Sequence, residues 1–596
     1  MATCTQKEEF VKSRVGGAKI ETEHEELLEL ARSQIYDRFW KNDTFIENLP
    51  VKDYRVLGPD FGNIGVCLPC TSLFLLERTL TAKLCDASNL ESDFSVRKLM
   101  NALIALQYVL AGEHAKGLQL EEYAESLVRD GKDPSKILHA QAYGLAVWAR
   151  NRGGLRSGPA SNPRFVALMR GLKVPGHEEN ALEEIYKEIR SDWMDEPSKI
   201  IRAARHLEAA AQVFTSRHVF SICEKFKFLG PALPERPKAV KVKAPGRVDL
   251  YGGWLDTPPI TFRLKNSAVV NMAIKVDGEL PLCCEAKVCE EVSGLVVECE
   301  GRKVKFEDFE AIHEAHDKPN LKGSLVCACL VAMGIYRSRE EPIIDRFKEV
   351  FHSAGVFVST HSTLPHGSGL GTSSILAAAI IKALGCLAGV NVAEEVLAVE
   401  QLLTTGGGWQ DQIGGVFPGI KVGYYSTNDK HVDVGNIEVE EEFLEELGKR
   451  LVLIYTGKTR LAKNLLQEFV RNYYEGDPTV HKVLENLQEG VKEFEVEIDK
   501  GSLPVKLVDE YYAAKKVLTP GCEPTAVGQL IEMLKNSGTI ETAWMAGAGG
   551  GGFLYVYLKP ETTFDYLSEK ISGDFRFSSM TCHTASVHMD GFEGFP

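Results

Sequence analysis

The spacing of apolar and polar positions changes once along the chain, near residue 236. Before that point, segments 96–112 and 197–214 place apolar residues at the spacing of amphipathic helices and contain few helix breakers. After it, apolar residues at 240–244 alternate with lysines, as in a half-buried strand. The pattern predicts a mostly α-helical region over 1–235, followed by a region that mixes strands and helices.

Glycine and proline mark the boundary between these regions. One glycine and three prolines fall within 230–237, and such a cluster is typical of a connection rather than of a helix or strand. Downstream, the apolar stretch Ile375–Val390 predicts a buried helix, and FLYVYL at 553–558 predicts a strand. We therefore expect a helical domain over 1–235 and at least one α+β domain after it.

Composition narrows the class of function. The chain has 596 residues, which suggests several domains, and a net charge of −15 with no basic run of the kind that binds nucleic acid. No segment reaches the roughly 20 apolar residues needed to span a bilayer, and the N-terminal residues lack the apolar core of a signal peptide. The 14 cysteines are scattered, as in a reducing compartment. We expect a cytoplasmic protein with small-molecule partners, no nucleic-acid partner and no membrane partner; the sequence carries no signal for its oligomeric state.

A glycine-rich loop precedes the predicted helix at Ile375–Val390. Glycines let successive backbone N–H groups converge on one anion, and the start of a helix adds unpaired N–H groups and positive potential. No lysine follows the last glycine, so this is not the usual P-loop. The alternative is an ordinary turn before a helix. The residues we predict to bind ATP are Pro365, His366, Gly367, Ser368, Gly369, Leu370, Gly371, Thr372, Ser373 and Ser374.

Two further segments accompany this loop. VKVKAPGRVDLYGGWLD occupies 240–256, and the glycine-dense AWMAGAGGGGF occupies 543–553. In this order, the three segments resemble the three motifs of the GHMP kinases, a superfamily of small-molecule kinases. Within it, GRVDLYGGWLDTPP (246–259) and GGGWQDQIGG (406–415) resemble the sugar 1-kinases, and the first of these segments is most similar to the fucokinases. The resemblance covers about Lys238 to the last residue.

The resemblance implies a two-lobed GHMP kinase fold behind the helical domain. We expect an N-terminal, ATP-binding lobe over 236–435 and a C-terminal lobe over 436–596. It also implies ATP and Mg²⁺ as cofactors. Fucokinase-like proteins carry a nucleotidyltransferase-like region ahead of the kinase. Because we find no convincing glycine-rich nucleotide-sugar motif near the start of this chain, we expect a shortened or partial form without pyrophosphorylase activity.

Transfer of a phosphoryl group to a sugar hydroxyl needs an oriented nucleophile, a metal ion and positive charge. Asp411 follows three glycines, where it is either a turn residue or a base that reaches the acceptor hydroxyl; the resemblance implies the catalytic role. Glu400 lies on a predicted helix among apolar residues, where it is either solvated or paired with a metal ion. By resemblance, Glu400 and Ser373 are the metal ligands, and Arg247 faces the reacting centre.

The sugar side of the predicted site involves two residues besides Asp411. Asp256 matches a carboxylate that accepts hydrogen bonds from sugar hydroxyls, and Trp254 either stacks on the sugar or is a buried structural residue. Galactokinases have Glu-His where this chain has Gly253 and Trp254, which argues against galactose. The third glycine motif resembles a segment that closes near the phosphates; its residues are Gly547, Gly549, Gly550 and Gly551.

The sequence therefore predicts ATP-dependent phosphorylation of L-fucose at the anomeric oxygen, giving L-fucose 1-phosphate. Fucose rests on the resemblance, because no residue spacing distinguishes a deoxyhexose from other sugars. Two alternatives stay open. One is a 1-kinase for another sugar such as a heptose phosphate, which would need a basic subsite for the existing phosphate; the other is a catalytically weak sensor that binds sugar and ATP.

Overall fold

The computed structural model describes residues 119–142, 163–223 and 236–593, apart from short gaps at 136, 140, 175, 193–196, 259, 265, 366, 391–398, 401, 404–405, 427–430, 459–464, 468, 471–472 and 474–477. The chain divides into two compact units: Met1–Thr215 with Arg471–His481, and Ser216–Val470 with Lys482–Pro596. None of the described helices combines the length and the hydropathy of a membrane-spanning segment. The predicted helix at 96–112 lies outside the described residues.

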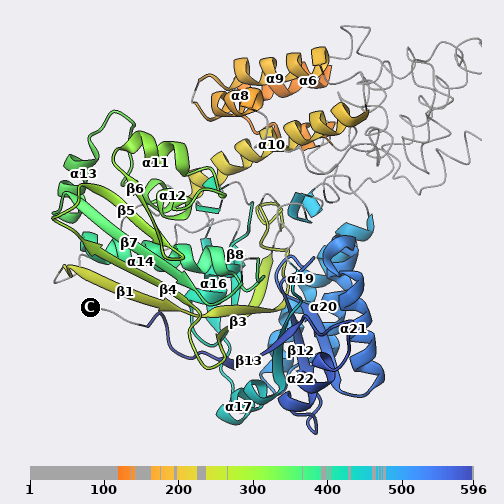
Figure 1. Cartoon of the computed structure of the whole chain (residues 1–596). Helices are drawn as coiled ribbons and strands as arrows, with labels where there is room; N and C mark the ends of the chain where they lie inside the picture. Colours follow the sequence, from red (N-terminus) through yellow and green to blue (C-terminus); the bar gives the residue numbers. More distant parts are fainter. Residues whose placement is uncertain are drawn as a thin grey trace, which may run out of the picture. The chain divides into compact units, whose positions relative to one another are not determined.

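The described part of the first unit is helical (Figure 1). Its elements are α6 (Gln119–Arg129), α8 (Pro163–Lys173), α9 (Glu178–Asp192) and most of α10 (Pro197–Cys223). Leu182, Ile185 and Ile189 of α9 recur at helical spacing and are fully buried, in one cluster with Leu207 of α10. The helical spacing predicted for 197–214 is confirmed by α10.

The second unit contains a five-stranded sheet in the order β1-β4-β7-β5-β6. All neighbouring pairs are antiparallel except β5 and β7, which are parallel. The strands are β1 (Ala239–Ala244), β4 (Leu282–Val288), β5 (Gly294–Cys299), β6 (Arg302–Phe306) and β7 (Gly355–Ser362). Val240, Val242 and Ala244 are the buried positions of β1, which confirms the predicted alternation.

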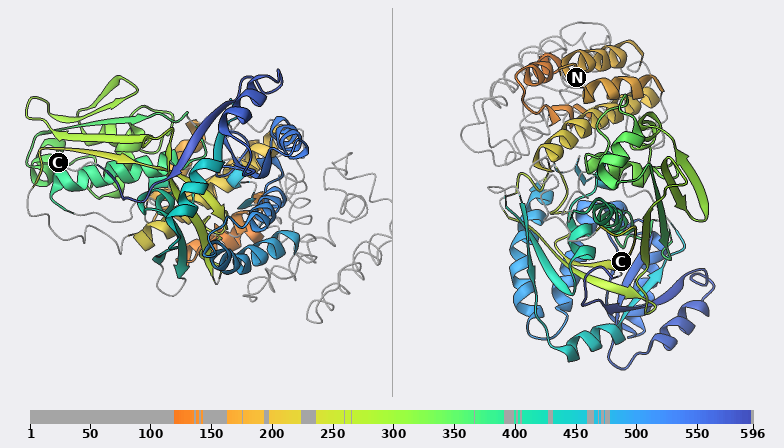
Figure 2. Two further views of the ribbon diagram at one scale, coloured as in Figure 1. Left: turned by 90° about the horizontal axis from the view of Figure 1, so that it is seen from below. Right: turned by 90° about the vertical axis from the view of Figure 1, so that its left-hand side faces the viewer.

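Helix α14 (Thr372–Ala388) packs against this sheet, on β1 and β4 (Figures 1 and 2). Thirteen of its 17 residues are buried, and a helix that is apolar on all sides is stable only inside a core. The predicted helix therefore exists and begins at Thr372. The other helices of this part are α11 (Phe309–Ala315), α12 (Ser324–Ala332) and α13 (Ile343–Phe351).

A second sheet of eight strands has the order β11-β12-β10-β13-β3-β8-β9, with β2 also paired to β3. The strands are β2 (Gly246–Tyr251), β3 (Ser267–Val276), β8 (Ile420–Ser426), β9 (His431–Asn436), β10 (Leu451–Tyr455), β11 (Ile540–Met545), β12 (Phe553–Leu558) and β13 (Thr581–Val587). The predicted strand FLYVYL is β12, buried at all six positions. Both predicted lobes contribute strands to this sheet; the division at 236 and 436 stays a prediction.

Helices cover the eight-stranded sheet, and two of them carry residues that matter below. The short α16 (Gln410–Val416) packs on β2 and β3, and α20 (Val505–Leu518) packs on β11 and β2. The remaining elements are α17 (Glu441–Arg450), α19 (Pro478–Ile498), α21 (Thr525–Asn536), α22 (Phe564–Ser572) and a 3₁₀ turn at Pro520–Cys522. The described structure thus confirms the predicted α+β class after a helical N-terminal region.

Candidate active site

The glycine-rich loop leads directly into the N-terminus of α14. Gly371 precedes the helix in the left-handed region, at a φ of 75°, and a Cβ there would lie 3.1 Å from Arg247 Cγ. Only glycine combines that backbone conformation with so close an approach. No described side chain caps the N-terminus of α14, so its first N–H groups remain donors for an anion.

The predicted ATP-binding residues differ in exposure along this loop. Gly367 and Ser373 are exposed, whereas Ser368, Leu370, Gly371 and Ser374 are buried, and Pro365, Gly369 and Thr372 are intermediate. His366 lies outside the described residues. The hydroxyls of Ser368 and Thr372 are 2.7 Å apart, which braces the loop against the first turn of the helix.

Backbone hydrogen bonds join the three motifs. The N–H of Arg247 donates to Leu370 O (3.1 Å), and the N–H of Phe553 donates to Ser368 O (2.9 Å). The glycine loop is therefore held on one side by the first motif and on the other by the third. The three segments that together resemble the GHMP kinase motifs are therefore in direct contact with one another.

Arg247 and Asp411 form an ion pair at the foot of the loop. The guanidinium places Nε 2.7 Å and Nη2 2.6 Å from Asp411 Oδ1, and its Nη1 donates to Gly369 O at 3.0 Å. Arg247 is almost fully buried, while a quarter of the Asp411 side chain is exposed. Burial alone would lower the pKa of Arg247, but Asp411 and Asp249 outweigh it and hold that pKa above its ordinary range.

A serine and a glutamate complete this cluster. The Ser374 hydroxyl lies 2.7 Å from Glu400 Oε1 and 3.2 Å from Asp411 Oδ2. Glu400 is buried, with 4% of its surface exposed. The structure thus brings Glu400, Asp411 and Arg247 together, as expected, and the serine that contacts the two carboxylates is Ser374, one position after the predicted metal ligand Ser373.

Asp249 is a buried hub that the sequence did not single out. Its Oδ1 accepts hydrogen bonds from Arg247 Nη1 (2.8 Å) and the N–H of Gly547 (3.1 Å). Its Oδ2 accepts from the Tyr511 hydroxyl (2.7 Å) and Lys515 Nζ (2.9 Å). This carboxylate therefore links the first motif, the third motif and helix α20.

The charges around Asp249 balance inside the core. Burial would raise the pKa of Asp249, yet Lys515 and Arg247 hold it below its ordinary value, so the carboxylate stays ionised. Lys515 is itself buried and also donates to Met545 O at 2.7 Å. The ion pairs join two cations, Arg247 and Lys515, to two anions, Asp249 and Asp411, and buried charges are tolerated when they are paired in this way.

Lys421 of β8 is a further residue that the sequence analysis missed, after Asp249 and Lys515. Its side chain is fully buried, and its ammonium group donates to the carbonyl oxygens of Gly414 (2.7 Å), Phe417 (2.5 Å) and Gly419 (3.1 Å). These three acceptors use all three of its protons. Gly414 and Phe417 belong to the C-terminal end of α16, so the lysine satisfies carbonyl oxygens at the end of the helix opposite Asp411, which lies in the first turn. Burial lowers the pKa of Lys421 well below its ordinary value.

The predicted sugar-binding residues lie next to the cluster that contains Arg247 and Asp411. Asp256 is buried; its Oδ1 accepts from the N–H of Trp254 and its Oδ2 from the N–H of Gln410, each at 3.2 Å. Burial raises the pKa of Asp256 to about 7, and the charge of Asp411 contributes. A Cβ at Gly408 would collide with the Asp256 carboxylate, so glycine is required for this approach.

Trp254 has an unusual backbone for a large side chain, with a φ of 86°. Its ring packs against Phe469 at a centroid distance of 4.9 Å, and its buried Nε1 has no hydrogen-bond partner among the described residues. Left-handed backbone at a residue other than glycine costs on the order of 1–3 kcal/mol and is concentrated at functional sites. Stacking on a sugar and a structural role both remain compatible with this geometry.

The third glycine motif is in contact with the other two. Gly547, with a φ of 55°, donates to Asp249, and the N–H of Gly550 donates to Cys522 O at 2.6 Å. Gly549 and Gly551 also have positive φ values, of 77° and 153°. The turn therefore closes over the Arg247 side of the cluster.

Comparisons with known proteins agree with this geometry. Residues 336–419 match the family described as GHMP kinases N terminal domain. The chain is 33% identical over 337 residues to the bifunctional fucokinase/GDP-fucose pyrophosphorylase of Arabidopsis thaliana, an alignment that covers 54% of this chain and 30% of the relative. It is 31% identical over 333 residues to the L-fucokinase/L-fucose-1-P guanylyltransferase of Bacteroides fragilis, an alignment that covers 53% of this chain and 34% of the relative.

A more distant relative acts on another sugar. The D-glycero-alpha-D-manno-heptose 7-phosphate kinase of Campylobacter jejuni is 26% identical over 217 residues, covering 35% of this chain and 62% of the relative. The chain spans about a third of the length of the two fucokinase relatives. Residues 336–419 thus match the N-terminal domain of the GHMP kinases, and about half of the chain is similar in sequence to two fucokinases, as the motifs predicted.

Proposed function

We propose that the protein transfers the γ-phosphoryl group of ATP to the anomeric oxygen of L-fucose, giving L-fucose 1-phosphate. The observation that carries the proposal is the convergence of Arg247, Asp411, Glu400 and Ser374 beneath the glycine-rich loop. Phosphoryl transfer depends on positioning and electrostatics, and this cluster supplies an anion, a cation and metal-binding oxygens at one point. Similarity to two fucokinases supports L-fucose as the acceptor.

We assign each residue a role, from its contacts where the structure describes them and otherwise from the resemblance. The loop from Pro365 to Ser374, His366 included, binds the phosphates of ATP through backbone N–H groups and hydroxyls. Glu400 would hold Mg²⁺ with a hydroxyl from Ser373, the ligand implied by resemblance, or from Ser374, its neighbour in space. The metal ion neutralises charge on the phosphates when bound.

Asp411 orients the acceptor hydroxyl and accepts its proton. Both contacts from Arg247 go to Oδ1, and among the described residues Oδ2 accepts only from the Ser374 hydroxyl, at 3.2 Å. The ion pair with Arg247 holds the carboxylate in a fixed orientation and stabilises charge that develops at the reacting oxygens. Asp256 accepts hydrogen bonds from other sugar hydroxyls, and Trp254 packs on an apolar face of the sugar.

The test is to incubate the full chain with Mg-ATP and a panel of sugars. The panel contains L-fucose, D-galactose, D-mannose and a heptose 7-phosphate, with ADP release measured and the phosphorylated position identified by ³¹P and ¹H NMR. We expect ADP release with L-fucose and a new anomeric phosphate. If only the heptose phosphate is phosphorylated, the protein is a kinase but L-fucose is not its acceptor. If the protein binds ATP but phosphorylates no sugar, the alternative of a catalytically weak sensor is favoured.

A further inference from the structure

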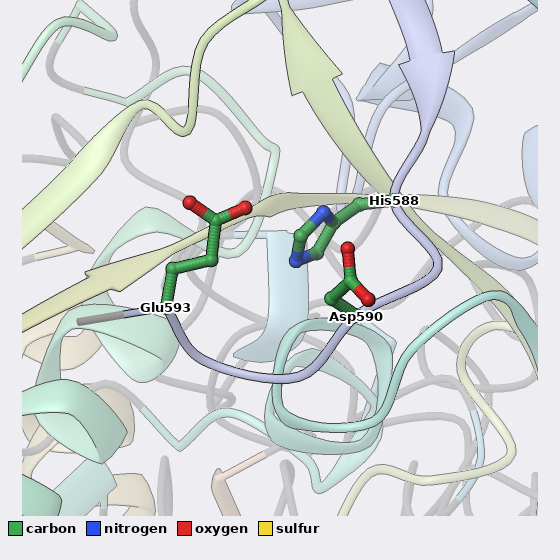
Figure 3. Close-up of side chains that lie close together, drawn as sticks. All are labelled: His588, Asp590 and Glu593. Carbon is green, nitrogen blue, oxygen red and sulfur yellow. The ribbon is translucent and has the colours of Figure 1, made fainter. Parts of the chain in front are cut away.

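A cluster of metal-binding side chains lies outside the kinase site, in the segment that follows β13 (Figure 3). His588, Asp590 and Glu593 each offer one ligand atom, and these atoms lie within 4.8 Å of one another. The imidazole stands between the two carboxylates in Figure 3. His588 is almost fully buried, Glu593 is intermediate and Asp590 is exposed, so the cluster opens to solvent on its carboxylate side.

The hydrogen bond of His588 fixes which ring nitrogen is free to bind a metal. Its Nε2 lies 3.0 Å from Gly591 O. A carbonyl oxygen only accepts, so Nε2 carries a proton, and in the neutral imidazole the lone pair is then on Nδ1. Nδ1 has no hydrogen-bond partner among the described residues. Metal-bound histidines have this arrangement, with the second ring nitrogen donating to a carbonyl or carboxylate.

Both ends of the segment are fixed to the sheets. The N–H of His588 donates to Ala273 O of β3 at 2.8 Å, and its carbonyl accepts from the N–H of Gly419 at 2.7 Å. Glu593 exchanges two backbone hydrogen bonds with Lys243 of β1, at 2.7 and 3.1 Å. The three side chains are therefore presented by a short segment whose first and last residues are held in place.

The charge of the cluster is only partly compensated. Lys275 Nζ lies 3.6 Å from Glu593 Oε1, so one cation faces two carboxylates. The lysine is one-third exposed and is free to turn toward solvent. A divalent cation bound between the carboxylates of Asp590 and Glu593 would neutralise their two negative charges.

We propose that His588, Asp590 and Glu593 bind a divalent transition metal ion, with Zn²⁺ as the best match. One imidazole nitrogen and two carboxylate oxygens suit Zn²⁺, whereas Mg²⁺ prefers six oxygens. Four-coordinate Zn²⁺ with ligands at about 2.0–2.2 Å needs them closer together than 4.8 Å, and the two solvent-facing carboxylates have room to close. A water molecule completes the tetrahedron.

The ion would join two layers of the second unit. Glu593 is anchored on β1 of the five-stranded sheet and His588 on β3 of the eight-stranded sheet. Coordination would therefore stabilise the folded state against local opening of residues 588–593. Stabilisation by a ligand that binds only the folded form grows with the logarithm of its concentration.

The test is a Zn²⁺ titration of the full chain after removal of metals, in competition with a chromogenic chelator. A large excess of Mg²⁺ is present throughout to occupy the kinase site. We expect one Zn²⁺ site per chain that excess Mg²⁺ does not displace. His588→Gln and Glu593→Gln should each weaken it by at least about tenfold. Unchanged affinity in His588→Gln overturns the proposal.

Two controls separate this site from adventitious binding. His583→Gln removes another histidine near a carboxylate, Asp277 Oδ2 at 2.7 Å, and should leave the affinity unchanged. Lys275→Gln should tighten binding, because it removes the competing cation. Co²⁺ in place of Zn²⁺ should give no thiolate charge-transfer absorption; such absorption would assign the metal to cysteines, and absence of stoichiometric binding would also overturn the proposal.

Discussion

Arg247 and Asp411 are 164 positions apart in the chain, yet two guanidinium nitrogens of Arg247 bond one carboxylate oxygen of Asp411, at 2.7 and 2.6 Å. Both bonds go to Oδ1, and this orients Oδ2 toward Ser374. The pair therefore fixes the orientation of the carboxylate before any substrate arrives. Preorganisation of this kind is what a phosphoryl-transfer site requires.

Asp411→Asn should reduce kcat by about 10²–10⁴-fold, the usual contribution of a positioned acid or base. The amide retains the shape of the side chain but accepts no proton, and it weakens the pairing with Arg247. ATP affinity, measured by calorimetry, should change little. Asp565→Asn, at an exposed position of α22, is the matched control and should behave as wild type. Near-normal turnover of Asp411→Asn would remove this residue from the mechanism.

Lys515 should act as a positioning residue through Asp249. Lys515→Met leaves a buried carboxylate short of one cation, and breaking such a pair costs about 3–5 kcal/mol of unfolding free energy. The double variant Asp249→Asn/Lys515→Met removes the unpaired charge and should recover much of that stability, measured by urea unfolding. Its kcat should nevertheless stay low, because Arg247 has lost the carboxylate that holds Nη1.

If the double variant recovers both stability and kcat, the pair of Asp249 and Lys515 has a purely structural role. Recovery of stability alone supports the positioning role. KM for ATP is a useful third readout, since the glycine loop still receives its backbone hydrogen bond from Arg247.

The pKa of Asp256 predicts a pH dependence of sugar binding. With a folded-state pKa raised to about 7, the carboxyl is neutral below that pH and ionised above it. An ionised carboxylate accepts stronger hydrogen bonds from hydroxyls, so KM for the sugar should fall as pH rises through 7. Asp256→Asn should flatten this profile, and an equally steep profile in that variant would assign the titration to another group.

The raised pKa of Asp256 also makes the stability of the folded protein depend on pH. Stability should fall as pH rises, whereas sugar binding should strengthen. The folded protein keeps a proton on Asp256 at pH values where the unfolded chain has lost it. This contribution to the free energy of unfolding is fully present below about pH 4 and is lost as pH rises through 7. Asp256→Asn should therefore gain stability relative to wild type as the pH is raised from 4 to 8, measured by urea unfolding.

Two neighbouring serines allow a direct test of the metal site. Ser374→Ala removes the hydroxyl that contacts Glu400, and Ser373→Ala removes the exposed hydroxyl one position earlier. If Ser373 is the ligand, as resemblance implies, its variant should need more Mg²⁺ for half-maximal rate while Ser374→Ala stays near wild type. The reverse order would assign the ligand to Ser374. Glu400→Gln should raise the Mg²⁺ requirement in either case, and an unchanged titration would exclude Glu400.

The sequence predicted the glycine loop, α14 and the alternation of β1, because each depends on local spacing. It also named Arg247, Asp411 and Glu400, which the fold brings together. It missed Lys515 and Asp249 because their contact joins α20 to β2 across more than 260 positions, and a lysine on a helix is ordinarily solvated. The only local signal was charge in an otherwise apolar strand, as in GRVDLY and in IKVGYYS around Lys421.

The sequence also could not predict that Ser374, rather than Ser373, contacts Glu400. Consecutive residues at a helix start point about 100° apart, so the contact with Glu400 depends on the rotational phase of α14. That phase is set by the packing of its buried face on β1 and β4, which no local pattern specifies.

Strand β13 has a position with consequences for how the chain is built. It lies between β10 and β3, and among the described strands it alone connects β11-β12-β10 with β3, β8, β9 and β2. Strand β3 is synthesised some 300 residues before the partner that completes its edge. During translation, residues 274–276 of β3 therefore lack their β13 partner, although β2 and β8 can already pair with the rest of the strand; an unpaired strand end of this kind is prone to mispairing. Cooperative folding of the eight-stranded sheet becomes possible only after β13 has left the ribosome.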